Sequence, residues 1–154
     1  MNRESSAEIQ KQEARAPARL GGFISIALFL ASLPLTGFVA GGAWPGYGIL
    51  FLGLLGAFSG EPANLIWFCN PLLFVGWIAL FRGEARLALG FTGAALLGGL
   101  LFLACRLVLV SEAGGEGYEI TSVGAGYWLW IASMLVAAGV SAHAVVSANG
   151  SDTQ

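Results

Sequence analysis

The charged residues of this chain are confined to a few short segments, and this distribution constrains its fold more than any other feature. Between Leu20 and Phe81 there is one charged side chain, Glu61. Six of the 7 Lys and Arg residues lie in the first 19 residues or in the break from Arg82 to Arg86. Long apolar segments joined by basic breaks are typical of multi-span membrane proteins whose basic loops face the cytoplasm.

The composition agrees with this interpretation. The chain has 154 residues, of which 56% are hydrophobic and only 10% are charged, whereas about 25% of the residues in a soluble domain are charged. Because one membrane span needs about 20 apolar residues, the length allows about four helices. We therefore predict an all-α, polytopic membrane protein: a four-helix transmembrane bundle with one short helix at its outer face.

The order of apolar and polar segments predicts the domain organisation. We expect a cytoplasmic polar tail over residues 1–19, a transmembrane bundle over residues 20–148 and a second polar tail over residues 149–154. The bundle should contain four spans, expected over residues 22–43, 63–81, 85–110 and 124–147.

The apolar segment 48–58 allows two topologies. As a helix it would be only about 16 Å long, against a hydrocarbon core of about 30 Å. If it crossed the membrane, Arg82 and Arg86 would lie outside while the basic N-terminal segment lay inside. If it is an interfacial or re-entrant helix on the outer side, both basic clusters lie inside, and so do both termini. The charge pattern favours the second topology, and the acidic connection 111–122 is then outside.

Small residues spaced four apart indicate possible helix contacts, because they share one helix face and let two backbones approach. Such faces could pack within the bundle, against a second copy or against a larger membrane partner. The expected packing residues are Gly37 and Gly41; Gly90, Ala94 and Gly98; and Ser133, Ala137 and Ser141.

The pair Asn70-Pro71 is the main candidate polar site. The amide of Asn70 needs partners within the apolar layer, and Pro71 removes the hydrogen bond that the carbonyl of Trp67 would accept. The pair could form a kinked helix whose Asn bonds to nearby backbone, or it could contact a ligand or an ion. Pro34, flanked by Ser32 and Thr36, predicts a second kink of the same kind.

Charge on the outer face is expected at Arg106, which should reach the lipid headgroups or pair with Glu61 or Glu112. His143 is a lone histidine near the cytoplasmic end and does not predict a metal site. The chain has 2 cysteines, Cys69 and Cys105, and no Cys-x-x-Cys pair that would indicate redox chemistry.

Sequence motifs for catalysis are missing. No Asp, Glu or Lys lies in the middle of an expected span, and there is no serine hydrolase, zinc protease, phosphate-binding or dinucleotide-binding motif. We therefore expect no enzymatic activity, no cofactor, no bound metal and no nucleic-acid partner.

Three segments resemble a group of small bacterial membrane proteins of uncharacterised function. They are the run from Tyr47 to Gly56, the run Trp67-Phe-Cys-Asn-Pro-Leu-Leu73, and Gly126-Tyr-Trp-Leu-Trp-Ile-Ala-Ser133. The usual pattern in that group is Trp-Leu-Ala-Asn-Pro, so Phe68 and Cys69 depart from it while Asn70 and Pro71 fit. The resemblance implies an inner-membrane protein with about four spans and implies no activity.

Two classes of function remain open at this point. In the first, the chain is a structural or interaction component that packs in the lipid bilayer on itself or on a larger membrane protein. In the second, it is a small transport or permeation module, with Asn70 and the hydroxyls of Ser32, Thr36, Ser133 and Ser141 lining a polar path.

Overall fold

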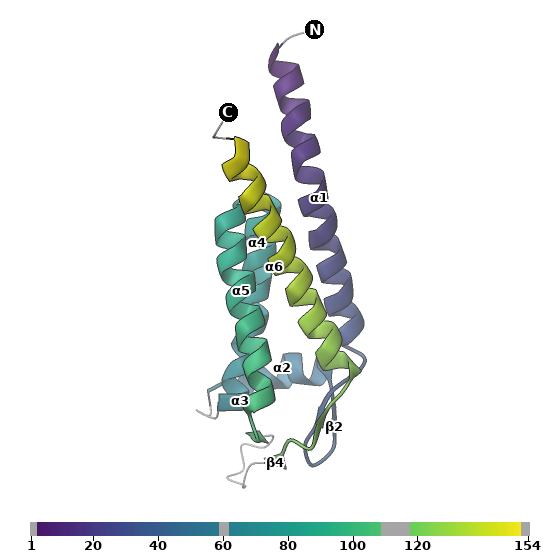
Figure 1. Ribbon diagram of the computed structural model, residues 1–154. Helices are drawn as coiled ribbons and strands as arrows, with labels where there is room; N and C mark the ends of the chain where they lie inside the picture. The colour runs from purple at the N-terminus through teal and green to yellow at the C-terminus, as the bar shows by residue number, and fades with distance from the viewer. Residues whose placement is uncertain (1–2, 59–61, 109–117, 152–154) are drawn as a thin grey trace.

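The protein is a bundle of long, nearly parallel helices, shown as a computed structural model in Figure 1. The structure describes residues 3–58, 62–108 and 118–151. Three stretches are long and apolar enough to cross a membrane: Ala63–Arg82, Ala85–Ala104 and Ala125–Asn149. Both ends of the chain lie at the same end of the bundle. The prediction of an all-α, membrane-type bundle is confirmed.

Helix α1 (Arg3–Ser32) differs from the expected first span at both of its ends. It begins within the predicted polar tail and extends beyond the other helices (Figure 1). It stops at Ser32, not at residue 43, because Pro34 has no N–H and disfavours helical geometry in the residue before it. The carbonyl of Leu30 accepts the Leu33 N–H at 3.3 Å. Pro34 therefore ends the helix, and the expected kink within a continuous helix does not form.

Short strands occupy the segment that was expected to continue the first span. Strand β1 (Thr36–Val39) pairs with β2 (Ala43–Pro45) and with β5 (Ser122–Val123) in an antiparallel sheet of order β2-β1-β5. Strand β3 (Leu107–Val108) pairs with β4 (Tyr118–Glu119). These strands were not expected. They supply backbone partners after the helix has ended at Pro34.

The glycines of this hairpin cannot form the expected helical packing pair. Gly37 lies in β1, and Gly41 lies in the turn to β2 with φ of +62°. That angle is in the left-handed region, which glycine adopts without steric cost. Gly37 therefore belongs to a strand and Gly41 to a turn, and the two do not share a helix face, which corrects the prediction.

Helix α2 (Gly46–Gly56) lies across the end of the bundle opposite to the termini (Figure 1). It has 11 residues, too few to span a bilayer core. It contacts β1, β2, α3 (Pro62–Leu65) and the 3-10 turn η1 (Ile66–Phe68). This position agrees with the expectation that segment 48–58 does not cross with the other helices.

Helices α4 (Cys69–Arg82) and α5 (Ala85–Leu101) form a hairpin with a two-residue connection. Gly83 follows α4 with φ of +82°, and its N–H bonds to the carbonyls of Ala79 and Leu80. After α5 the chain continues through the 3-10 turn η2 (Phe102–Ala104) and becomes extended at Cys105. The third helical stretch therefore ends before residue 110, where it was expected to end.

The inward face of α5 differs from the one predicted by small-residue spacing. Gly90 and Ala94 are exposed, and nothing lies within 4 Å of a Cβ placed on Gly90. The buried residues of α5 are Ala88, Thr92, Ala95 and Gly99. Their spacing of three or four residues defines one helix face. Small residues permit a close contact, but the larger neighbours on each face decide which face points inward.

The last helix, α6 (Ala125–Ser151), packs against α1 and α5. Its residues Ser133, Ala137 and Ser141 are fully buried, as the spacing predicted. The core between the helices contains aromatic and aliphatic side chains, with Phe29 of α1 in edge contact with Trp77 of α4. Where α4 meets α5, a Cβ on Gly76 would lie 2.5 Å from Cγ2 of Thr92. This close approach makes the hairpin tight.

Candidate functional site: an apolar cavity beneath helix α2

Asn70 lies at the first turn of α4 and joins two other parts of the protein. It is 5% exposed. Its Nδ2 donates to the carbonyl of Trp67 at 3.1 Å, and its Oδ1 accepts from Nε1 of Trp130 at 3.0 Å. Pro71 cannot donate to the Trp67 carbonyl, so the side-chain amide takes the place of the missing backbone N–H. The local 3-10 turn η1 at this point is typical of a strained helix.

Trp67 continues this set of hydrogen bonds to α2. Its Nε1 donates to the carbonyl of Leu50 at 2.8 Å. A Cβ on Gly53 would lie 2.6 Å from Cδ1 of the same indole. The glycine therefore lets α2 rest directly on the ring of Trp67. Through Trp130, Asn70 and Trp67, helix α6 is connected to α4 and then to α2.

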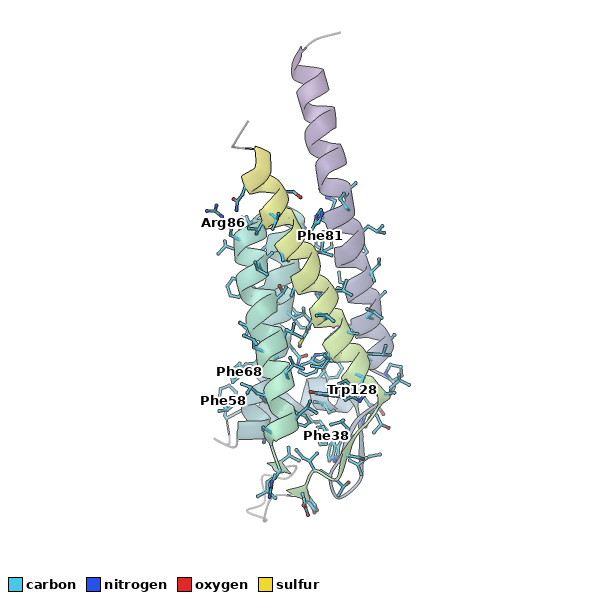
Figure 2. The ribbon with its side chains drawn as sticks, viewed as in Figure 1. Phe38, Phe58, Phe68, Phe81, Arg86 and Trp128 are labelled. Carbon is cyan, nitrogen blue, oxygen red and sulfur yellow. The ribbon has the colours of Figure 1, made fainter. Side chains whose placement is uncertain are left out.

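A cavity of about 600 Å³ lies beneath α2, and we call it the α2 cavity. Its floor and walls come from the end of α1, the β1–β2 hairpin, η1 and the adjacent ends of α4 and α6. The apolar walls include Phe29, Phe38, Ile49, Phe102 and Val108. Figure 2 shows Phe38, Phe58, Phe68 and Trp128 at this end of the bundle, with Phe81 and Arg86 at the other.

The α2 cavity is open toward the outside of the bundle. Leu52, Leu55 and Phe58 line it and are 56%, 60% and 77% exposed. No residue of α2 is buried, although the helix consists of glycine, tyrosine and aliphatic or aromatic side chains. An apolar helix with no buried residue is stable only where its surroundings are apolar as well.

The polar side chains in the cavity wall bond to the protein itself. Ser32 Oγ donates to the carbonyl of Phe29 at 2.6 Å, and Asn64 Nδ2 donates to the carbonyl of Gly56 at 3.1 Å. Asn70 bonds to Trp67 and Trp130, as described above. None of the described lining residues carries a charge. The cavity therefore presents mainly hydrocarbon and ring surface.

The residues proposed for a polar path do not come together. Ser32 and Asn70 line the α2 cavity, whereas Thr36, Ser133 and Ser141 do not. Ser133 Oγ donates to the carbonyl of Trp130 at 2.7 Å, and Ser141 Oγ to the carbonyl of Ala137 at 2.7 Å. Such bonds to the preceding turn of the same helix leave no donor directed into a path.

A second polar cluster was missed by sequence reasoning. Ser25 of α1 is fully buried, donates to the carbonyl of Ser133 at 2.7 Å and accepts from Nε1 of Trp77 at 2.9 Å. It ties α1 to α4 and α6 in the middle of the bundle. A lone serine in an apolar segment was the available signal, but its partners are 52 and 108 residues away.

Several other candidates are placed by the structure. Arg106 is exposed. Its expected partners, Glu61 and Glu112, lie outside the described residues, so the ion pair stays a prediction. His143 is exposed. Cys69 is buried, Cys105 is half-buried, and both are free thiols. Within residues 3–58, 62–108 and 118–151, no three His, Cys, Asp or Glu side chains gather as metal ligands.

At the end of the bundle with the termini, Arg86 Nη2 donates to Oδ1 of Asn149 at 3.1 Å. Arg82 and Arg86 both belong to this end, near the short turn between α4 and α5. The basic residues of that turn and the N-terminal helix are therefore on one side of the apolar zone, as positive loops on one membrane face would be.

Comparison of the chain with protein-family models, with curated proteins and with solved structures finds no match.

Proposed function

We propose that this chain is a small, non-catalytic integral membrane protein that serves as a structural or interaction component of a bacterial inner membrane. The observation that carries the proposal is the contrast between its interior and its surface. The described polar side chains within the bundle bond to the protein, whereas large apolar side chains cover the outside. A protein of this kind acts through its lipid-facing and partner-facing surfaces.

The proposal includes four membrane crossings with both termini in the cytoplasm. Three helical stretches have the necessary length and hydropathy. The fourth crossing would use the apolar part of α1, Ala16–Ser32, which is about 25 Å long as a helix and close to the thickness of the core. Arg19, Arg82 and Arg86 would then belong to the cytoplasmic side, in keeping with the positive-inside rule.

A pair of single cysteines tests this orientation in a background without Cys69 and Cys105. Gly42→Cys lies in the β1–β2 turn and Glu84→Cys in the turn after α4, and both positions are exposed. A membrane-impermeant maleimide added to intact cells should reach Gly42→Cys only after the outer membrane is permeabilised and should not label Glu84→Cys. The opposite labelling pattern would reverse the orientation.

Copurification tests the interaction function. Tagged protein extracted from native membranes in a mild detergent should retain a second copy or another membrane protein in a fixed ratio. Recovery of a monomer alone, after chemical crosslinking in intact membranes as well, contradicts the proposal.

The alternative is the small transport or permeation module, and one observation favours it. Asn70 and Ser32 line a cavity of about 600 Å³ that is open at one side. Asn70→Leu would then reduce solute flux through reconstituted vesicles. Its effect must exceed that of the control Ser141→Ala, whose hydroxyl faces its own helix and lies outside the cavity.

A further inference from the structure

We infer that the α2 cavity is a lipid site that holds one acyl chain of a bilayer phospholipid. This inference rests on the membrane location proposed above. It goes further by assigning a specific occupant to one place in the protein.

The opening determines where an occupant comes from. Leu52, Leu55 and Phe58 line the cavity and are exposed on the outer side of α2. Helix α2 lies across the end of the bundle (Figure 1). In the membrane location proposed above, its exposed apolar side chains rest against lipid. A molecule that enters past these side chains comes from the hydrocarbon of the membrane and not from water.

The wall determines the chemical class. The hydroxyl of Ser32 bonds to the carbonyl of Phe29, and the indoles of Trp67 and Trp130 bond to Leu50 and Asn70. An ion or a strongly polar solute would lose its hydration without gaining a charged partner among the described lining residues, which is unfavourable. A hydrocarbon chain makes dispersion contacts with this wall and loses no hydrogen bond.

The volume fits one chain. Liquid water allots roughly 30 Å³ to each molecule, and a methylene group is of similar size, so about 600 Å³ accommodates on the order of twenty heavy atoms. This is the size of one acyl chain and is smaller than a whole phospholipid. An empty apolar space would leave its wall without contacts, and the penalty grows with volume. Acyl chains are the solvent on the open side, so they are the occupant at hand.

Among the described residues at this end of the bundle, the charged ones are Arg106 and Glu119, and both are exposed. One charge of each sign does not favour a particular headgroup, so the inference concerns the acyl chain alone.

The test uses the full-length protein purified in detergent and then supplied with phosphatidylcholine that carries bromine atoms on one acyl chain. Bromine on a bound chain should quench the fluorescence of Trp44, Trp67 and Trp130, which line the cavity. All measurements use a Trp128→Phe background, because Trp128 is 51% exposed and lies outside the cavity, where bulk lipid would quench it. We expect quenching that saturates near one lipid per protein, and native mass spectrometry should show one retained phospholipid.

Two matched substitutions locate the site. Gly48→Leu adds a side chain at a lining position, where a Cβ meets only Pro45 at 3.6 Å, and Gly90→Leu adds the same side chain on α5, where nothing lies within 4 Å. Lipid binding should weaken at least tenfold in Gly48→Leu and stay unchanged in Gly90→Leu. Ala63→Leu, at a second lining position, provides an independent variant if Gly48→Leu does not fold.

Several outcomes would overturn the inference. They are the absence of a retained lipid on the wild-type protein, equal binding by all folded variants, and retention of a free fatty acid or an isoprenoid in place of a phospholipid. Recovery of the protein in the soluble fraction of broken cells would refute the membrane location instead, so the two failures are distinguishable.

Discussion

The indole Nε1 of Trp130 donates to Oδ1 of Asn70 at 3.0 Å and joins two residues that are 60 positions apart in the chain. Asn70 at the same time satisfies the carbonyl of Trp67 that Pro71 leaves without its helical donor. One amide therefore compensates the backbone defect of α4 and fixes α6 against it.

Replacing Asn70 with Leu should lower the free energy of unfolding by about 1–3 kcal/mol, because it removes a partly buried hydrogen bond from the Trp67 carbonyl and another from the Trp130 indole N–H. Thermal unfolding in detergent measures the effect. The matched variant is Trp130→Phe, and the double variant should lose less than the sum of the two single losses, since both remove the same bond. Strict additivity would contradict the coupling.

The contact between α4 and α5 should be intolerant of a single methyl group at Gly76. A Cβ there would lie 2.5 Å from Cγ2 and 3.3 Å from the backbone N of Thr92. Gly76→Ala should cost about 1–3 kcal/mol of stability, as overpacking does. Gly90→Ala is the control on the exposed face of α5, and it should be neutral or stabilising by up to about 1 kcal/mol. Equal midpoints of thermal unfolding for Gly76→Ala and Gly90→Ala would contradict the close contact between α4 and α5.

The β1–β2 turn should require glycine at position 41 and not at position 42. Gly41 has φ of +62°, and a Cβ there would collide with the ring of Tyr118. Gly41→Ala should therefore destabilise the hairpin by about 1–2 kcal/mol. Gly42 has nothing within 4 Å of a Cβ, so Gly42→Ala should change little. Hydrogen exchange at the amides of β1 and β2 reports the difference, and equal protection in both variants would count against this assignment.

The two cysteines should differ in their reactivity with maleimide, and their labelling should not change when a reductant is added. Cys69 is buried and Cys105 is half-buried, and both are free. Burial raises the pKa of the Cys105 thiol, so its reactive thiolate is scarce at neutral pH and increases as the pH rises. Maleimide should label Cys105 slowly, faster at pH 9 than at pH 7, and should label Cys69 only after unfolding.

Single replacements with Ala separate the two cysteine signals. The Cys69→Ala variant should keep the pH-dependent labelling, and Cys105→Ala should lose it. A mass shift of the untreated wild-type protein on reduction would instead reveal a disulfide.

The sequence predicted the ends of helices well where an apolar run stops at a charged residue. Arg82 and Arg86 bracket the turn between α4 and α5, and such positions are unambiguous because a charged side chain is costly inside an apolar layer. It also indicated that Asn70 needs partners. The identity of one partner, Trp130, could not be predicted, since it depends on how α6 rotates against α4.

The sequence did not predict where helix α1 ends or that strands follow it. The run after Ser32 has no charged residue, like the second half of the helix before it. Hydropathy therefore extended the first span through residues that form β1 and β2. Pro34 was interpreted as a kink, because a proline in a membrane helix can be accommodated by neighbouring groups. The α2 cavity had no sequence signal, because a void follows from the shapes of side chains on many separate elements, from α1 to α6.

The two-residue turn at Gly83 and Glu84 also bears on how the protein is made. Because α4 and α5 are joined so closely, the two helices and their turn can leave the translocation channel as one helical hairpin. Their mutual contacts are local in sequence, so they form early and at little entropic cost. Helix α1 then depends on α6, which follows α5 in the chain, for most of its neighbours. A ribosome stalled before residue 125 would thus leave α1 without its principal contact, and premature termination there should yield a chain that membrane proteases remove.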